Sequence, residues 1–307
     1  MTRLPLSFAC WDYDRTAALA DGRVSVDGID LNFQKLEVEE TFFRMLRFKE
    51  FDAAELSMSS YLVTVGRGAQ DFIAIPVFPS RIFRHSCIFV SNKSAIEKPE
   101  DLIGKRIGVP EYQMTAPVWI RGILQDEYGV DPASVTYFTG GEEEPGREEK
   151  LKLNLPARFN VRAIGPDQTL SAMIAEGEID AMYTARAPST FYSAPDKVRR
   201  LFQDSVTVEK AYFGKTGIFP IMHVVALRRE VYEKNRWVAQ ALYKAFVEAQ
   251  RLAYETLLVS ASLKTMLPWQ VAAVEEALSI MGENWWPYGI ERNRHVIVTF
   301  TRYHHEQ

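Results

Sequence analysis

Cysteine is scarce in this sequence: Cys10 and Cys87 are the only two among 307 residues. Two thiols cannot form the disulfide framework of a small secreted domain, so two free buried thiols are the simpler interpretation and a single bridge is the alternative. Neither cysteine stands in a Cys-x-x-Cys motif or in a Cys/His cluster with metal-ligand spacing. His304 and His305 are adjacent, and no His-x-His or His-x-x-x-His pair occurs in the chain. The sequence therefore predicts no metal site.

Long apolar runs and an excess of positive charge are also missing. No segment approaches the ~18 apolar residues of a membrane-spanning helix. The mildly apolar stretch Leu4–Trp11 contains Pro5 and is followed by Asp12, so it is too short for the core of a signal peptide, and we expect the mature chain to begin near Met1 in the cytoplasm. The net charge of −4 gives no electrostatic footprint for nucleic acid or an anionic membrane. Locally clustered cations must therefore bind any anionic ligand.

Strand and helix patterns alternate along the chain, which is long enough for two domains. A short strand ends at Ser57, and a helix follows with serines at its capping positions. A second helix begins near Thr115 and ends at Gly129, and Asn235 is placed to cap a longer helix with a regular apolar stripe. The alternation predicts an α/β protein with mainly parallel sheets, whose ligands bind beyond the carboxyl ends of the strands.

Three segments resemble type 2 periplasmic binding proteins. They are PEDLIGKRIGVP at Pro99–Pro110, GEIDAMY at Gly177–Tyr183 and IMHVVALRREVYEKN at Ile221–Asn235. The resemblance implies a two-lobed α/β fold with a ligand cleft between the lobes. Because the chain in that fold leaves the first lobe and later returns to it, we predict a discontinuous first lobe of residues 1–84 and 219–307 around an inserted second lobe of residues 85–218.

Five further segments carry a narrower resemblance. They are FDAAELSMSSYL, PVFPSRIFRHSCIFV, GGEEEPGREEKLKLNLP, DAMYTARAP and FPIMHVVALRREVY, and the closing YHHEQ fits as well. Together they resemble the 4,5-dihydroxyphthalate decarboxylase family. This resemblance implies an enzyme of phthalate catabolism that converts a dihydroxylated aromatic dicarboxylate to protocatechuate and CO₂. A solute-binding protein of an ABC transporter for a small organic anion is the alternative that the fold alone would favour, and a sensor domain is a third hypothesis.

The implied reaction indicates which side chains the site needs. A hydroxyl para to the departing carboxylate makes the ring its own electron sink, so no organic cofactor is required. The protein must supply a base for the phenol, an acid near the ring carbon, and cations for two carboxylates. The lack of histidine pairs at ligand spacing argues against a metal-dependent decarboxylase of the amidohydrolase type. We therefore expect a cofactor-free enzyme whose partner is a small aromatic dicarboxylate, and homo-oligomerisation is left open.

Three arginines are candidate ligands of the substrate carboxylates, because the guanidinium fork matches a carboxylate with two hydrogen bonds. Arg81 and Arg84 lie in the polar run where the chain is predicted to cross between lobes, which is a common place for ligand sites. Arg186 follows the end of a predicted strand. For each of them, an ordinary salt bridge with a structural carboxylate is the alternative.

Polar residues at two predicted helix starts are further candidates for anion binding, since free backbone N–H groups point outward there. These residues are Ser57, Ser59 and Ser60 at one helix and Thr115 at the other. Plain capping is the alternative, and the two roles are compatible. Trp11 and Tyr13 follow the first predicted strand and are candidates to stack on an aromatic ring.

Two histidines near the predicted crossings are the candidate proton carriers, because imidazole titrates near neutral pH. His85 lies in the polar run and His223 lies at the second crossing; a hydrogen-bonded core histidine is the alternative for His223, and a surface ion pair for His85. Two carboxylates, Asp14 and Glu111, are the alternative carriers and are also candidates to accept the catechol protons. For Asp14, an ordinary turn residue is the other interpretation.

Overall fold

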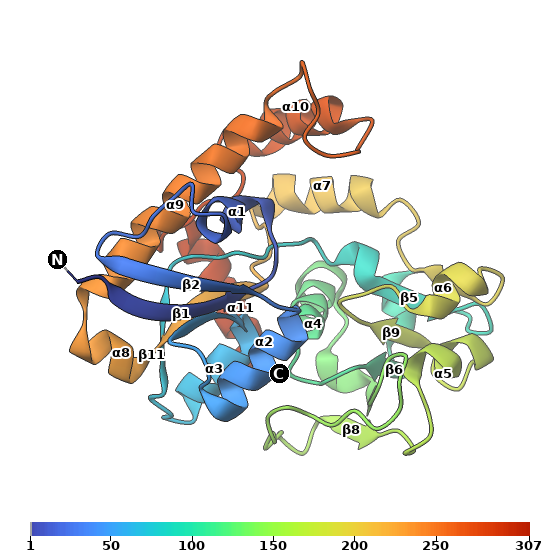
Figure 1. The fold of residues 1–307 in the computed structure, drawn as a ribbon. Helices are drawn as coiled ribbons and strands as arrows, with labels where there is room; N and C mark the ends of the chain where they lie inside the picture. Colours follow the sequence, from blue (N-terminus) through green and yellow to red (C-terminus); the bar gives the residue numbers. More distant parts are fainter. Residues whose placement is uncertain (1) are drawn as a thin grey trace. The chain divides into compact units, whose positions relative to one another are not determined.

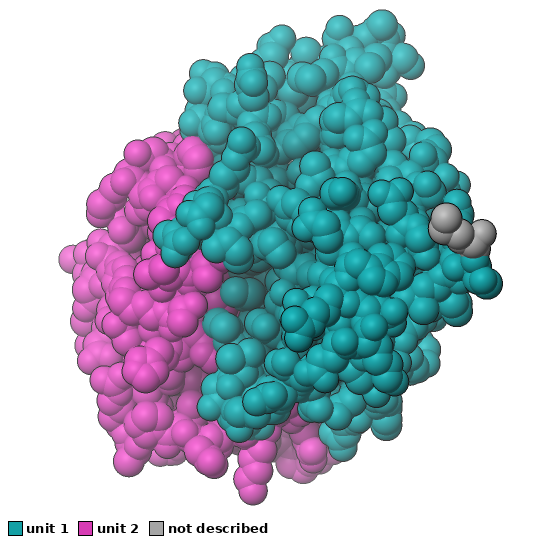
Figure 2. All heavy atoms as spheres, turned by 90° about the vertical axis from the view of Figure 1, so that its left-hand side faces the viewer, with its two compact units in different colours: residues 1–81, 221–294 teal, residues 82–220, 295–307 magenta. Residues whose placement is uncertain are grey.

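The structure, a computed structural model, describes residues 2–307. The chain divides into two compact units, which Figure 2 colours separately. Unit 1 comprises Met1–Arg81 and Ile221–Arg294, and unit 2 comprises Ile82–Pro220 and His295–Gln307. Each unit is built around one β-sheet.

Unit 1 contains a five-stranded sheet in the order β2-β1-β3-β11-β4. Figure 1 labels β1, β2 and β11 of this sheet. Its strands are β1 (Leu4–Cys10), β2 (Ile29–Lys35), β3 (Ala53–Ser57), β4 (Phe72–Ile75) and β11 (His223–Arg228). β1 runs parallel to β2 and β3, whereas β11 runs antiparallel to β3 and β4. All five residues of β3 are buried, because this strand lies in the middle of the sheet. Any polar side chain on β3 must therefore find a partner inside the protein.

The helices of unit 1 are α1 (Asp14–Ala20), α2 (Val38–Phe48), α3 (Met58–Gly66), α8 (Arg229–Lys234), α9 (Trp237–Leu257), α10 (Gln270–Met281) and the short 3-10 helix η4 (Glu291–Asn293). α10 lies against α9. The predicted cap of α3 is confirmed, since the Ser57 side chain accepts a hydrogen bond from the Ser60 backbone N–H at 3.2 Å. The predicted apolar stripe of α9 is also buried, from Val238 through Ala249. The N-cap of α9 is Arg236, one residue beyond the predicted Asn235.

Unit 2 contains a six-stranded sheet in the order β10-β5-β9-β6-β7-β8. Its strands are β5 (Ile88–Ser91), β6 (Arg106–Val109), β7 (Thr136–Thr139), β8 (Asn160–Ala163), β9 (Ala181–Tyr183) and β10 (Val198–Arg200). β6, β7, β8 and β9 run parallel, whereas β5 is antiparallel to β9 and β10. Both sheets are thus mixed rather than mainly parallel as predicted, because β5 in one and β11 in the other pair antiparallel with their neighbours.

The helices of unit 2 include the βα segment that the sequence predicts most clearly. They are η1 (His85–Cys87), η2 (Pro99–Leu102), α4 (Thr115–Tyr128), η3 (Pro132–Ser134), α5 (Leu170–Glu176), α6 (Ser189–Ser193), α7 (Ser205–Thr216) and α11 (Arg294–Glu306). α4 ends at Gly129 in a left-handed conformation, as predicted. Within residues 2–307, no helix combines the length and the apolar character needed to cross a membrane.

The division into units differs from the predicted lobes at the end of the chain. Residues 219–307 are all predicted to belong to the first lobe, whereas residues 295–307 belong to unit 2. Phe300 of α11 stacks on Trp119 of α4 with ring centroids 5.0 Å apart, and Tyr303 meets the same indole edge-on at 5.7 Å. This aromatic contact holds the C-terminal helix on unit 2.

Candidate active site

A buried carboxylate lies at the centre of unit 1. Glu55 stands in the middle of β3 with no exposed surface. Its Oε1 accepts a hydrogen bond from the Tyr13 hydroxyl at 2.6 Å and lies 2.6 Å from Nδ1 of His223. Its Oε2 accepts from the Trp11 backbone N–H at 3.0 Å and from the Cys10 thiol at 3.4 Å. Both oxygens of Glu55 are therefore bonded, as a buried carboxylate requires.

The charge of Glu55 has an identifiable partner. Burial alone would raise the pKa of this carboxyl, but the imidazole of His223 and the hydrogen bonds from His223 and Tyr13 outweigh burial and hold the pKa below its usual value. Within residues 2–307, Glu55 forms no ion pair with an arginine or a lysine. Among the described residues, His223 is the basic side chain that contacts Glu55 directly.

Strand register places His223 beside Glu55. His223 is the first residue of β11 and pairs with Ser57 of β3, two positions from Glu55, so the two side chains lie on the same face of the sheet. The imidazole ring packs edge-on against Phe42 at 4.9 Å and remains 16 % exposed. Nδ1 is held by Glu55, and Nε2 has no hydrogen-bond partner in the described part of the chain. His223 therefore has one ring nitrogen held by Glu55 and one that is unbonded within residues 2–307.

An arginine that the sequence analysis did not select lies next to this cluster. The guanidinium of Arg15 lies over the rings of Tyr13 and Trp286, at 4.0 and 4.2 Å from their centroids. Its Nε donates to the Pro79 carbonyl at 2.5 Å, and it pairs with Asp14 at 3.0 Å. A cavity of about 100 Å³ adjoins it, lined by Asp14, Arg15, Gln250, Ala253, Tyr254, Leu257, Trp285 and Trp286.

The predicted aromatic and acidic residues of this region have different surroundings. Tyr13 belongs to the Glu55 cluster through its hydroxyl, whereas the Trp11 side chain is 37 % exposed. Asp14, the first residue of α1, is about half exposed and paired with Arg15. Its position favours a surface ion pair over proton transfer.

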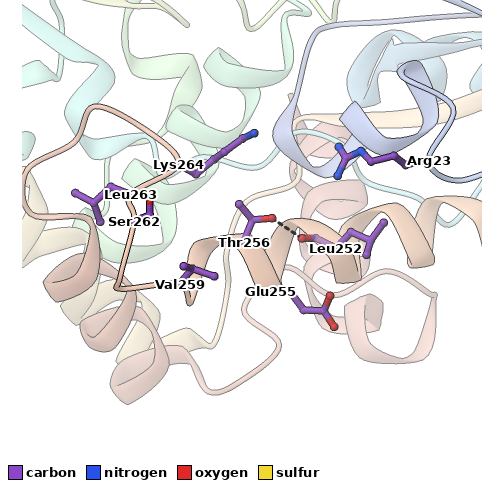
Figure 3. A pocket seen from close by; sticks show the side chains of 8 residues that line it. All are labelled: Arg23, Leu252, Glu255, Thr256, Val259, Ser262, Leu263 and Lys264. Atoms are coloured by element: carbon purple, nitrogen blue, oxygen red, sulfur yellow. Dashed lines mark hydrogen bonds between the residues drawn. The ribbon is translucent and has the colours of Figure 1, made fainter.

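A second hollow of unit 1, of about 410 Å³, lies along the C-terminal part of α9 (Figure 3). It is lined by Arg23, Leu252, Glu255, Thr256, Val259, Ser262, Leu263 and Lys264. The bond drawn in it, from the Thr256 hydroxyl to the Leu252 carbonyl at 2.9 Å, is an ordinary contact within one helical turn. None of the predicted site residues lines this hollow, and we assign it no part in the reaction.

In unit 2, Glu111 follows the carboxyl end of β6 and is fully buried. Its carboxylate accepts two hydrogen bonds from Arg147, at 2.6 and 3.0 Å, and one each from the side chain and the backbone N–H of Lys150. Burial would raise its pKa, but Lys150 and Arg147 outweigh burial and lower it. Glu111 is thus an ionised residue that anchors the loop after β7, which favours a structural role over proton transfer.

In two glutamates of this loop, burial raises the pKa, whereas the pKa of Glu111 is lowered. Burial raises the pKa of Glu142 and of Glu149 to about 7. Glu142 accepts a hydrogen bond at 2.5 Å from the hydroxyl of Thr184, which follows β9. Arg186 acts in the other direction and partly lowers the pKa of Glu142, so its guanidinium lies within electrostatic reach of that carboxyl. Sequence reasoning missed Glu142, because nothing in the run of three glutamates at residues 142–144 distinguishes it.

His85 lies in an apolar part of unit 2. Its ring packs against Phe202 at 5.4 Å and Tyr212 at 5.1 Å and is 1 % exposed. Within residues 2–307, neither ring nitrogen has a hydrogen-bond partner. Burial lowers its pKa to about 4, so it is neutral at pH 7. His85 therefore differs from His223, whose Nδ1 is hydrogen-bonded to Glu55 and whose side chain is partly exposed.

The three predicted arginines occupy three different environments. Arg81 is buried over the ring of Phe78 and donates to the Pro287 carbonyl at 2.8 Å, and burial lowers its pKa to about 9. Arg84 is equally buried and donates to the Ala185 carbonyl at 3.3 Å. Arg186 is exposed beyond the end of β9. The exposure of Arg186 suits it best to a ligand carboxylate.

The predicted helix-start residues are buried. They are Ser57 and Ser60, which form the cap of α3, Ser59 beside them, and Thr115, the first residue of α4.

Within the described chain, no group of three or more histidine, cysteine, aspartate or glutamate side chains is arranged to hold a metal ion.

The chain is similar to known proteins along its whole length. It is 40% identical over 307 residues to a protein of Comamonas testosteroni named 4,5-dihydroxyphthalate decarboxylase, covering all of this chain and 93% of that protein. It is 48% identical over 204 residues to a protein of the same name from Pseudomonas putida, covering 66% of this chain and 79% of that protein. No family model matches the chain.

A solved structure supports the fold. The periplasmic sulfonate-binding protein SsuA of Methylobacillus flagellatus KT aligns with 98% of this chain and 88% of its own, with a TM-score of 0.52 and 12% identity. At this identity the likeness concerns the fold alone. It confirms the predicted periplasmic-binding-protein-like α/β architecture.

Proposed function

Because this chain belongs to the 4,5-dihydroxyphthalate decarboxylase family, we propose that it removes CO₂ from 4,5-dihydroxyphthalate, or from a close analogue, to give protocatechuate. The observation that carries the proposal is the 40% identity with the relative from Comamonas testosteroni over the whole chain. The protein is then a carboxy-lyase whose partner is a small aromatic dicarboxylate.

The chemistry needs proton transfers and no external electron sink. A base removes the proton of the hydroxyl para to the departing carboxylate, and the phenolate pushes electron density onto the carbon that bears this carboxylate. That carbon accepts a proton and the ring becomes a dienone. The bond to the carboxylate then breaks, CO₂ leaves, and the bonding electrons return to the ring, which regains aromaticity. The net reaction consumes one proton and releases one CO₂.

His223 is our proposed proton carrier, because Nδ1 is fixed by Glu55 while Nε2 is left to exchange a proton. Nδ1 lies 2.6 Å from Glu55, and the ring retains some exposed surface. His85 is enclosed by aromatic rings, and Glu111 is paired with Arg147 and Lys150, so both are worse placed to exchange protons. General acid–base catalysis by one such group typically contributes ~10²–10⁴-fold.

Arg186 is our proposed ligand of a substrate carboxylate. It follows the carboxyl end of β9, where ligands of α/β proteins bind, and its side chain is exposed. A guanidinium can form two hydrogen bonds with one carboxylate. Arg81 and Arg84 stay candidates, although each already donates to a backbone carbonyl.

The test is an assay of the purified protein, treated with a chelator, with 4,5-dihydroxyphthalate. We expect equimolar protocatechuate and CO₂, and no turnover of phthalate, which lacks the para hydroxyl. Binding of both compounds without turnover would overturn the proposal and favour a solute-binding protein. Activity only after addition of a divalent metal would overturn the cofactor-free part alone. The cytoplasmic location is likewise a proposal, and cell fractionation tests it.

A further inference from the structure

We propose that Glu55 is the positioning residue of the reaction: its buried carboxylate holds the Nδ1–H of His223 and thereby presents Nε2 as the atom that exchanges the proton. The inference rests on the proposed function. It concerns a residue that the sequence analysis did not select and that need not touch the substrate. Tyr13, whose hydroxyl shares Oε1 of Glu55 with His223, is the second member of the arrangement.

The hydrogen bonds decide the tautomer. An ionised carboxylate only accepts hydrogen bonds, so the ring nitrogen 2.6 Å from Glu55 must carry a proton. In a neutral imidazole the other nitrogen is then the basic one. Nε2 is therefore ready to take a proton, and the imidazolium that forms lies against a carboxylate that no arginine or lysine of the described chain neutralises.

The burial of Glu55 argues against a purely structural pair. Removing a carboxylate from water is costly, and a well-packed apolar residue in the middle of β3 would stabilise the sheet at least as well. In this protein the costly burial places a negative charge with no exposed surface next to His223, whose side chain is partly exposed. A carboxylate that orients a histidine in this way also stabilises the imidazolium that forms during proton transfer.

Tyr13 weakens the interaction between Glu55 and an imidazolium at His223. Its hydroxyl donates to Glu55 Oε1 at 2.6 Å and so withdraws negative charge from the oxygen that faces His223. Loss of this donor would strengthen the hold of Glu55 on an imidazolium, and loss of the Glu55 charge would weaken it. The variants Tyr13→Phe and Glu55→Gln should thus change the pH dependence of activity in opposite directions.

The experiment measures kcat, KM and the pH profile together with the ¹⁵N signals of the histidine rings. The chain has five histidines, and the spectrum of His223→Gln identifies the signals of His223. In the wild-type protein we expect the tautomer with the proton on Nδ1. In Glu55→Gln we expect loss of that preference, kcat lower by about 10²–10⁴-fold, and KM changed far less.

The pH profile separates positioning from simple loss of stability. The midpoint of the acidic limb should move to lower pH in Glu55→Gln and to higher pH in Tyr13→Phe. Asp52→Asn is the matched control, because Asp52 precedes the same strand but pairs with Arg228 and Ser7, so its loss should leave the tautomer and the midpoint unchanged. If Glu55→Gln does not fold, the pH midpoint of Tyr13→Phe still tests the inference, because only a shift to higher pH supports it.

Two results would overturn the inference. One is a His223 ring in the wild-type protein with its proton on Nε2, and the other is a pH midpoint that moves in the same direction, or not at all, in Glu55→Gln and Tyr13→Phe. Failure of the proposed function looks different. A protein with the expected tautomer, but with no turnover of 4,5-dihydroxyphthalate, would retain the Glu55–His223 arrangement and lose only the assigned reaction.

Discussion

The ring of Tyr303 occupies the space directly above the Cα of Gly122. A Cβ placed on Gly122 would lie 2.1 Å from Cδ2 of this ring, far inside van der Waals contact. Tyr303 is 2% exposed, and its hydroxyl donates to Asp126 at 2.7 Å, so the ring is fixed from both ends. The glycine therefore allows α11 to lie close to α4.

We expect Gly122→Ala to destabilise the protein by about 1–3 kcal/mol, because the methyl group must displace a packed ring. Gly214→Ala in α7 is the control, since nothing lies within 4 Å of its added Cβ. That change should be neutral or stabilise by up to about 1 kcal/mol. The free energies of unfolding come from urea titrations followed by circular dichroism. Equal stabilities of the two variants would contradict the packing argument.

His223→Gln should lower kcat by about 10²–10⁴-fold and leave ligand affinity largely intact, because glutamine cannot carry a proton through a reaction cycle. His85→Gln is the comparison. Since His85 is enclosed by Phe202 and Tyr212, we expect its loss to affect stability more than turnover. Turnover is measured with 4,5-dihydroxyphthalate and affinity by calorimetry. Near-wild-type kcat in both variants would eliminate the histidine mechanism.

Arg186→Ala should weaken binding of a dicarboxylate by about 2–5 kcal/mol, as expected for the partner of a bound charge. Arg162→Ala is the control, since this exposed residue of β8 hydrogen-bonds Asn160. Arg81→Ala and Arg84→Ala should mainly reduce stability, because both side chains are buried. Calorimetric titration with 4,5-dihydroxyphthalate provides the affinities. Normal binding by Arg81, Arg84 and Arg186 variants alike would refute the assignment of carboxylate binding to arginine.

Local patterns in the sequence predict several elements of the fold, α4 and α9 among them. The apolar stripe of α9 and the glycine at the end of α4 depend on residues three or four positions apart, and both are found where expected. The assignment of α11 to unit 2 depends on Tyr303 meeting Gly122, a contact across 181 positions that no local pattern encodes. The predicted lobe boundary therefore differs at the C-terminus.

The candidate site is harder to predict than the fold, for the same reason. The hydrogen bond between Glu55 and His223 joins residues 168 positions apart and depends on the antiparallel pairing of β3 with β11. One local signal does exist. Glu55 is the only charged residue in the strand Ala53–Ser57, and a charged residue in a buried strand requires a partner. This signal alone predicts that Glu55 has a buried partner.

Burial of Glu142 should make the stability of the protein depend on pH. Its pKa is raised from the ordinary value of 4.5 to about 7, so between these two pH values the folded protein binds a proton that the unfolded chain releases. This contribution to the free energy of unfolding is fully present below pH 4.5 and is lost as the pH rises through 7. Because the side chain keeps some contact with water, we expect the loss to be about 1–2 kcal/mol.

Glu142→Gln removes the titrating group and keeps an acceptor for the Thr184 hydroxyl, which donates to Glu142 at 2.5 Å. The variant should therefore lose less stability than the wild-type protein between pH 5 and pH 8, and its advantage should be largest at pH 8. Glu144→Gln is the matched control, since it makes the same change at an exposed position of the same loop. Urea unfolding at each pH gives the free energies. If all three proteins lose the same amount between pH 5 and pH 8, the buried Glu142 carboxyl does not titrate in this range.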